Sequence, residues 1–263
     1  MRILLINPNT SFAMTERMIT SARANLAPDV ELIAITAEEG VPYIASRAEA
    51  LVAGTTTLEL IARHQHGMDA VVIAAFGDPG LIAARELFDL PITAMAEAAM
   101  LTACMLGPRF SIITFSHALT AWYEDAVALA GLQPRCASIR VPRAAFRSVH
   151  DVQHELEDDL AALACRAVEE DKADVVLLAG APLTGLAARI AARVPVPLVD
   201  PLDAAIGQAT LLARLRTRPA QAGRFARPGA KTAVGLTPAL AAWIEHRNEA
   251  AGMPAPHARQ EAN

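Results

Sequence analysis

The sequence has few cysteines, no long apolar run and no excess of positive charge. Its three cysteines, Cys104, Cys136 and Cys165, are odd in number and widely spaced. This spacing argues against a disulfide framework and favours a reducing, cytoplasmic location. The longest apolar stretch, residues 92–106, is interrupted by Glu97 and is too short to span a membrane. A net charge of −5 makes nucleic acid and anionic membranes poor partners.

Other signals are missing as well. Residues 1–6 are too short for the apolar core of a secretory leader. No Gly-rich loop follows the first expected strand of either half, which disfavours a nucleotide cofactor. His150 and His154 lie one helical turn apart, but the carboxylate between them is Asp and the segment is remote from the predicted strand ends. We therefore expect neither a cofactor nor a metal.

What the chain does contain is a loose internal repeat. Residues 69–81 and 174–186 each consist of an acidic residue, an apolar run, a turn of small residues and a Gly-Leu pair that leads into a helix. A repeated strand–loop–helix unit is typical of two similar lobes. Two facing sets of strand ends form a cleft, and the cleft is where the chemistry is expected.

Strands and helices alternate along most of the chain, which indicates parallel sheets with right-handed crossovers. Apolar runs predict strands over 2–6, 30–36, 70–74, 92–94, 109–115, 137–141, 175–178 and 197–199. Helical periodicity is expected over 13–26, 46–64, 80–88, 97–105, 120–130, 151–170, 186–193 and 203–215. The predicted fold is α/β, with two pseudo-symmetric Rossmann-like lobes, each a parallel sheet flanked by helices. Lobe one would comprise 1–106 with about 205–240, lobe two 107–204, and 250–263 would be a disordered tail.

Several motifs resemble a known family. They are residues 7–11 after the first strand, 40–44 with Ser46, 76–81, Pro91 with 97–99, and 109–110. Together they resemble the aspartate/glutamate/hydantoin racemase superfamily, in its hydantoin and allantoin racemase branch, over roughly residues 2–237. The resemblance implies a small-molecule site between two lobes, no cofactor and a homo-oligomer.

The same resemblance implies a catalytic pair that this chain does not have. Racemases of this kind use two thiols, one on each lobe, to remove a proton from one face of a carbon and to return one to the other face. The first thiol position corresponds to Ala75 and the second to Gly180. Because neither a methyl group nor a hydrogen exchanges protons, the two-thiol mechanism cannot operate here.

Three other residues are candidates for acid–base chemistry. Histidine is a common general acid or base, and His117 lies with Ser116 at the end of the first strand of lobe two. Asp78 lies at the same strand end as Ala75 and fits a base, an orienting carboxylate or a helix N-cap. Ser116 fits a nucleophile or a hydrogen-bond donor, whereas a lone loop histidine is more often a solvated or capping side chain.

The remaining candidates would bind substrate. Asn9, Thr10 and Ser11 offer amides, hydroxyls and backbone N–H groups at a helix start, which suits a carboxylate or imide oxygen. Turn formation and capping explain the same residues equally well. Further expected contacts are Tyr43, Ala75, Phe76, Gly77, Thr114, Gly180, Ala181 and Thr184.

Three functions remain open at this point. The first is an enzyme that acts on a small hydantoin, thiohydantoin, amide or carboxylate by cysteine-independent hydrolysis, elimination or lyase chemistry; the sequence analysis favours this one. The second is a racemase or isomerase with non-thiol bases, such as Asp78 on one side and His117 on the other. The third is an inactive paralogue that binds the ligand without turnover.

Overall fold

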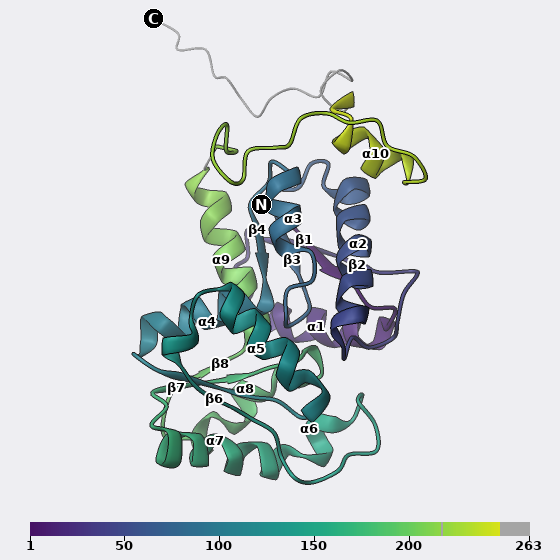
Figure 1. Cartoon of the computed structure of the whole chain (residues 1–263). Coiled ribbons are helices and arrows are strands. Elements are labelled where there is room, and N and C mark those ends of the chain that lie inside the picture. Colours follow the sequence, from purple (N-terminus) through teal and green to yellow (C-terminus); the bar gives the residue numbers. More distant parts are fainter. Residues whose placement is uncertain (217, 248–263) are drawn as a thin grey trace, which may run out of the picture.

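A computed structural model describes residues 1–216 and 218–247 as two lobes, each built on a four-stranded parallel sheet (Figure 1). The strands of the first sheet run in the order β2-β1-β3-β4, and those of the second in the order β6-β5-β7-β8. Lobe one contains β1 (Arg2–Asn7), β2 (Glu31–Thr36), β3 (Ala70–Ile73) and β4 (Ile92–Ala94). Lobe two contains β5 (Phe110–Ile113), β6 (Cys136–Arg140), β7 (Val175–Leu178) and β8 (Leu198–Val199). The predicted fold class is confirmed.

The central strands are apolar because both of their faces are covered. All residues of β3, β5 and β7 are buried, as is β1 after Arg2. Near-continuous Val, Ile and Leu runs are typical of parallel strands between two helix layers. The outer strand β6 is only partly buried along its length. Strands in the middle of each sheet are therefore apolar on both faces, whereas the outer strand β6 is not fully covered.

Ten α-helices lie within the described ranges 1–216 and 218–247. They are α1 (Phe12–Asn25), α2 (Arg47–His64), α3 (Leu81–Leu87), α4 (Met95–Leu106), α5 (Thr120–Leu129), α6 (Val152–Glu155), α7 (Glu157–Asp171), α8 (Leu186–Ile190), α9 (Pro201–Leu215) and α10 (Pro238–Ile244). Ser11 caps α1 by accepting the Met14 N–H, and Ser46 caps α2 by accepting the Glu49 N–H. None of the helices in these ranges is long and apolar enough to cross a bilayer.

Two stretches differ from the helices expected from the sequence. The single helix predicted over 151–170 is interrupted at Leu156, whose φ of −115° and ψ of 13° lie outside the helical range and whose side chain is buried. Turning Leu156 into the core breaks the helical path and separates α6 from α7. The short α10 was not predicted. It begins at Pro238, is capped by Thr237 and packs against α2.

Helices α4 and α9 join the two halves. They pack against each other, and each follows the last strand of one sheet while also contacting the other sheet. Helix α4 contacts β5 and β7, and α9 contacts β3 and β4. Each of the two helices therefore follows one sheet and packs against the other, in keeping with the lobe boundaries expected from the sequence. The boundaries themselves stay a prediction. The tail expected over 250–263 lies outside the described residues.

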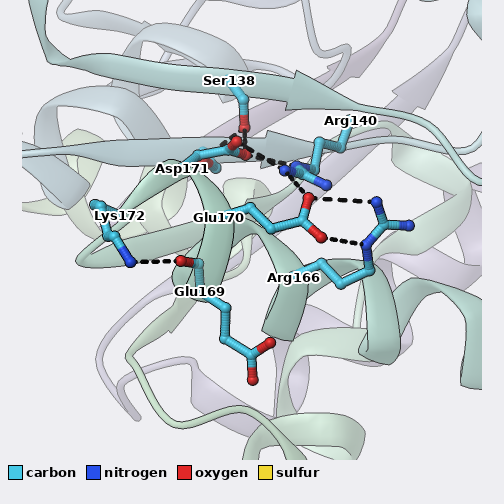
Figure 2. A network of polar contacts seen from close by, with 8 residues as sticks. Ser138, Arg140, Arg166, Glu169, Glu170, Asp171 and Lys172 are labelled. Carbon is cyan, nitrogen blue, oxygen red and sulfur yellow. Dashed lines mark hydrogen bonds and ion pairs between the residues drawn. The ribbon is translucent and has the colours of Figure 1, made fainter.

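A network of charged side chains covers the outer edge of the second sheet (Figure 2). Arg140 on β6 donates to both carboxylate oxygens of Asp171 at the end of α7, at 2.5 and 2.7 Å, and to Glu170 at 2.7 Å. Ser138 donates to Asp171 at 2.5 Å, and Arg166 donates to Glu170 at 2.9 Å. Arg140 lowers the pKa of Asp171 by its hydrogen bonds. Charged side chains on an edge strand oppose pairing with another sheet.

Candidate active site at the lobe junction

The loops that follow β3 and β5 meet between the two lobes. Phe76, just after β3, packs against Tyr123 of α5, with ring centroids 4.6 Å apart. A Cβ atom built on Gly77 would lie 2.4 Å from the Trp122 ring, so the chain approaches α5 as closely as glycine permits. Arg47 of α2 pairs with Asp125 of α5 beside these contacts. The carboxyl ends of the two sheets are therefore packed together, as expected for a site between two α/β halves.

The junction concentrates the aromatic residues of the protein. Six of the eleven aromatic side chains lie here, and we call them the junction aromatic cluster: Tyr43, Phe76, Phe115, Trp122, Tyr123 and Phe146. The ring centroids of Tyr43 and Phe115 are 5.9 Å apart, and those of Phe115 and Phe146 are 5.5 Å apart. Tyr43 and Phe76 come from lobe one and the others from lobe two. The cluster gives the junction an apolar wall in which polar groups interact strongly.

The two positions that resemble thiol sites each follow the third strand of their half of the chain. Ala75 follows β3 and is buried. Gly180 follows β7 with φ of +112°, a conformation that residues with a side chain rarely adopt. A Cβ built on Gly180 would lie 2.9 Å from Phe115 Cε1 and 3.4 Å from the Tyr123 hydroxyl oxygen. Phe115 and Tyr123 therefore take the space that a side chain at position 180 would need.

Asp78 supplies a carboxylate at the same junction. One of its oxygens accepts the Ala96 N–H and the other accepts the Glu97 N–H, both at 2.7 Å. These N–H groups belong to the first turn of α4, where a negative charge is favoured. Asp78 keeps some solvent exposure, yet the protein packed around the carboxyl raises its pKa to about 7, against the opposing effect of the two hydrogen bonds. Asp78 therefore titrates near neutrality.

This geometry corrects one reading of the sequence. Asp78 was expected to be a base, an orienting carboxylate or the N-cap of the helix directly after it. The residue before α3 is Gly80, which makes no side-chain cap. The carboxylate instead reaches α4, about eighteen residues further along the chain. To do so Asp78 takes a left-handed φ of +56°, which aspartate tolerates better than most residues.

Tyr123 lies between the two thiol-like positions. It is buried, packs against Phe76 on one side and brings its hydroxyl next to Gly180 on the other. Its hydroxyl shares a hydrogen bond with Thr114, which itself donates to the Ala179 carbonyl at 3.1 Å. Burial raises the pKa of Tyr123, and the charge of Asp78 raises it further. Tyr123 is therefore a neutral phenol that donates hydrogen bonds, electrostatically coupled to Asp78.

The sequence and the fold were compared with known proteins. The family model described as Asp/Glu/Hydantoin racemase matches residues 3–209. The chain belongs to this family. It is 33% identical to a hydantoin racemase of Paenarthrobacter aurescens over 88% of this chain and 99% of that one. It matches the allantoin racemase from Klebsiella pneumoniae with a TM-score of 0.84 at 33% identity, covering 91% of this chain and 98% of that one. The resemblance drawn from the motifs is confirmed.

A more distant match concerns the fold alone. A crystal structure of arylmalonate decarboxylase aligns with a TM-score of 0.58 at 21% identity, over 81% of this chain and 92% of that chain. At this level of identity the match says nothing about the chemistry of the present protein. The two relatives at 33% identity are named as racemases, one of hydantoin and one of allantoin.

The cysteines do not replace the thiols that this family member lacks. Cys104 lies in the last turn of α4, Cys136 on the outer strand β6 and Cys165 on α7. The thiol of Cys136 donates to the Ser138 carbonyl, and burial raises its pKa to about 11. The thiol of Cys165 donates to the Arg193 carbonyl. None of these positions belongs to the loops that form the junction.

The loop after β1 is stabilised by hydrogen bonds between its own residues. Asn9 accepts hydrogen bonds from the Asn7 side chain and the Ser11 N–H, at 3.1 and 2.9 Å. Ser11 caps α1, and the Thr10 N–H donates to the Val41 carbonyl. Turn and capping roles therefore account for Asn9 and Ser11. Substrate contact by Asn9, Thr10 and Ser11 stays a prediction.

Ser116 and His117 lie at the rim of the junction. The Ser116 hydroxyl accepts the Ala118 N–H and caps a short 3-10 turn, residues 117–119. His117 is exposed, whereas Tyr123 of the next helix is buried in the aromatic cluster. The catalytic roles expected for Ser116 and His117 stay predictions. Tyr123 was missed because a tyrosine within an amphipathic helix is usually a core residue.

Two predicted binding residues retain unpartnered hydroxyls. The hydroxyl of Tyr43 is buried at the junction, lacks a hydrogen-bond partner, and belongs to a ring that packs on Phe115. The Thr184 hydroxyl, four residues after Gly180, is also buried and unpartnered. Ala181 begins the 3-10 turn that lies between Gly180 and Thr184. Since buried hydroxyls are normally satisfied, Tyr43 provides a hydrogen-bonding position for a ligand beside the aromatic cluster.

Proposed function

We propose that this protein is a cofactor-independent isomerase that moves a proton at the carbon next to a carbonyl of a small cyclic ureide. Asp78 and Tyr123 take the roles that thiols have in related racemases. The substrate class follows from the relatives, which are named hydantoin and allantoin racemases. The observation that carries the proposal is the coupled carboxyl–phenol pair at a junction whose thiol-like positions are Ala75 and Gly180.

Asp78 is the group suited to remove the proton. Its pKa of about 7 matches the range in which a general base works best at neutral pH. The ionised carboxylate takes the proton from carbon, and the electron pair of the C–H bond moves onto the carbonyl oxygen as an enolate. The Tyr43 hydroxyl, which has no partner among the described residues, donates a hydrogen bond to that oxygen and stabilises the charge in an apolar environment. Return of the proton from Asp78 regenerates the substrate.

Inversion requires a proton from the opposite side. Tyr123 supplies it. Asp78 then releases the proton it took to water, and the tyrosinate takes a proton from water before the next turnover. Because the pKa of Tyr123 is raised, proton delivery from Tyr123 is slower than the return of the proton from Asp78. We therefore expect hydrogen exchange at the carbon to be faster than loss of optical activity.

The test follows single enantiomers of a 5-substituted hydantoin and of allantoin in D2O. Proton NMR measures exchange at the ring carbon, and polarimetry measures inversion. Exchange that precedes inversion, and that is lost in Asp78→Asn, supports the proposal. Inversion as fast as exchange, or full exchange in Asp78→Asn, would refute it.

A second candidate is a binding protein without turnover. The observation that favours it is the close packing of Phe115 and Tyr123 around the second thiol-like position. In that case the same ligands raise the melting temperature, while neither exchange nor inversion occurs. Hydrolysis, elimination or lyase chemistry stays a prediction with no support from the relatives, and chromatographic detection of a ring-opened product is its test.

Two properties complete the proposed function. The sequence predicts a cytoplasmic protein and a homo-oligomer. Light scattering of the purified chain measures the oligomeric state, and a mass equal to that of one chain would contradict the prediction of a homo-oligomer. Fractionation of the source cells tests the location.

A further inference from the structure

A second cavity lies away from the junction aromatic cluster. It has a volume of about 790 Å³ and is formed by α1 of lobe one and by α6, α8 and the start of α9 of lobe two. No member of the aromatic cluster lines it. A volume of this size is in the range of small-molecule sites.

One end of this cavity carries two guanidinium groups, those of Arg17 and Arg189. Within the described part of the chain, Arg17 donates to two carbonyl oxygens, those of Pro182 and His150, and makes no ion pair. Burial lowers the pKa of Arg17, and the charge of Arg189 in the same cavity lowers it further, whereas the charge of Asp151 raises it.

Arg189 pairs with Glu157, which does not line the cavity. The buried Gln153 accepts from Arg189 at 2.7 Å and fixes its position. An anion between the two guanidinium groups would relieve their repulsion.

The orphan hydroxyl of Thr184 lies in the wall of this cavity. Thr184 is 3% exposed, its Oγ1 has no hydrogen-bond partner, and the residue lines the cavity. A buried hydroxyl without a partner costs free energy unless a ligand or water satisfies it. Thr184 therefore offers a hydrogen bond to a bound molecule.

The other end of the cavity is acidic. Asp200 accepts only backbone N–H groups, from Gly185 and Leu202, and Asp203 accepts from the neutral side chain of Asn25. Neither carboxylate forms an ion pair within residues 1–216 and 218–247. Asn25 follows Arg17 by eight residues on α1, so the backbones of these two residues are about 12 Å apart along the helix axis.

We propose that this cavity binds a linear zwitterion, with its carboxylate at Arg17 and Arg189 and its ammonium group at Asp200 and Asp203. The placement of Arg17 and Asn25 eight residues apart favours a ligand whose two charged groups are several bonds apart over a compact α-amino acid such as glycine. It fits an ω-amino carboxylate, a basic amino acid bound through its side-chain amine, or a short peptide. This site does not depend on the proposed isomerase activity.

The experiment is a calorimetric titration of the whole protein with zwitterions of increasing length. Glycine, 4-aminobutanoate and 6-aminohexanoate form the series, and hexanoate and hexylamine each carry one charged end. We expect 6-aminohexanoate to bind at least tenfold more tightly than glycine, hexanoate or hexylamine. Titrations with lysine and triglycine distinguish a basic amino acid from a peptide. Equal affinity for 6-aminohexanoate and hexanoate, or no binding by any probe, would overturn the proposal.

Substitutions test which end of the cavity binds the carboxylate and which binds the ammonium group. Thr184→Val and Arg17→Met should weaken the binding of 6-aminohexanoate and hexanoate by at least fivefold. Asp203→Asn should weaken 6-aminohexanoate alone and so remove its advantage over hexanoate. Arg166→Met, a matched change on the far side of lobe two, should leave both affinities unaltered. Binding retained in Asp78→Asn separates this site from the junction, and a loss of binding in Asp78→Asn alone would contradict it.

Discussion

The two lobes share a strand order but differ in how they hold the loop after the third strand. In lobe one, Asp78 lies in the loop and accepts N–H groups from the start of α4. In lobe two, Asp200 lies at the start of α9 and accepts the N–H of Gly185 in the loop. In lobe one the loop supplies the carboxylate and the helix supplies the N–H groups, whereas in lobe two the carboxylate lies at the helix start and the loop supplies the N–H group. As a result, only lobe one presents this carboxylate at the junction.

The loops after the first strands differ as well. In lobe one this loop is held by the amide of Asn9, whereas in lobe two it begins with Phe115 of the aromatic cluster. A symmetric two-base reaction needs equivalent groups on both sides. Here lobe one contributes a carboxyl and lobe two a phenol, so a pseudo-symmetric backbone supports asymmetric chemistry. Four predictions test how far the two lobes differ at the junction.

The largest effect is expected from replacing Asp78 of lobe one. The matched replacement of Asp200 in lobe two serves as its control. Asp78→Asn should lower the rate of hydrogen exchange about 10³-fold, because it removes the base. Asp200→Asn should lower this rate by less than about tenfold, since its carboxylate connects α9 to a loop. NMR exchange rates in D2O measure both. Equal losses would show that the two carboxylates have the same role.

The next effect concerns the phenol of lobe two. Tyr123→Phe should reduce inversion about 10²-fold and exchange less, because the face of the carbon opposite Asp78 loses its proton source. Polarimetry and NMR on the same samples give the two rates. If inversion survives unchanged, Tyr123 is a packing residue and His117 becomes the candidate to test.

A smaller effect is expected from adding one methyl group to each lobe at the junction. Gly77→Ala should destabilise the protein by about 3 kcal/mol, because its Cβ would overlap the Trp122 ring at a positive φ. Gly180→Ala should cost about 2 kcal/mol, and a second change, Phe115→Leu, should recover part of it. Urea unfolding measures these free energies. A neutral Gly180→Ala would mean that Phe115 does not restrict this position.

The smallest effect is the dependence of stability on pH. The pKa of Asp78 is about 7 and that of Asp200 about 6, both above the usual value near 3.9, so the folded state binds these protons more tightly. Stability should therefore fall by a few degrees of melting temperature as pH rises from about 4 to 7. Asp171 has a lowered pKa, so its contribution is present above about pH 4 and is lost as the pH falls through its folded-state value.

Two variants separate these contributions in thermal melts. Asp78→Asn should flatten part of the trend between pH 4 and 7. Arg140→Met should lower the melting temperature at pH 7 and reduce the further loss of stability in acid, because Asp171 no longer gains from the ion pair. A wild-type melting temperature that rises between pH 4 and 7 would contradict the raised pKa values.

The sequence predicted the buried strands and most helices to within a few residues, because apolar periodicity is a local signal. It also identified the family, since the motifs around Asp78 and Asn9 are continuous in the chain. It did not predict α10 or the break at Leu156. It also missed Tyr123 and the pairing of Gly180 with Phe115. Each of these depends on packing between segments far apart in the chain, which no local pattern encodes.

The protein contains two tryptophans, and only one of them lies between the lobes. Trp122 packs on Gly77 at the junction, whereas Trp243 belongs to α10 and packs on Phe88. Replacing Trp243 with phenylalanine would leave a single indole whose fluorescence reports separation of the lobes. In that variant the emission of Trp122 would report directly on the packing between the lobes, where the proposed site lies.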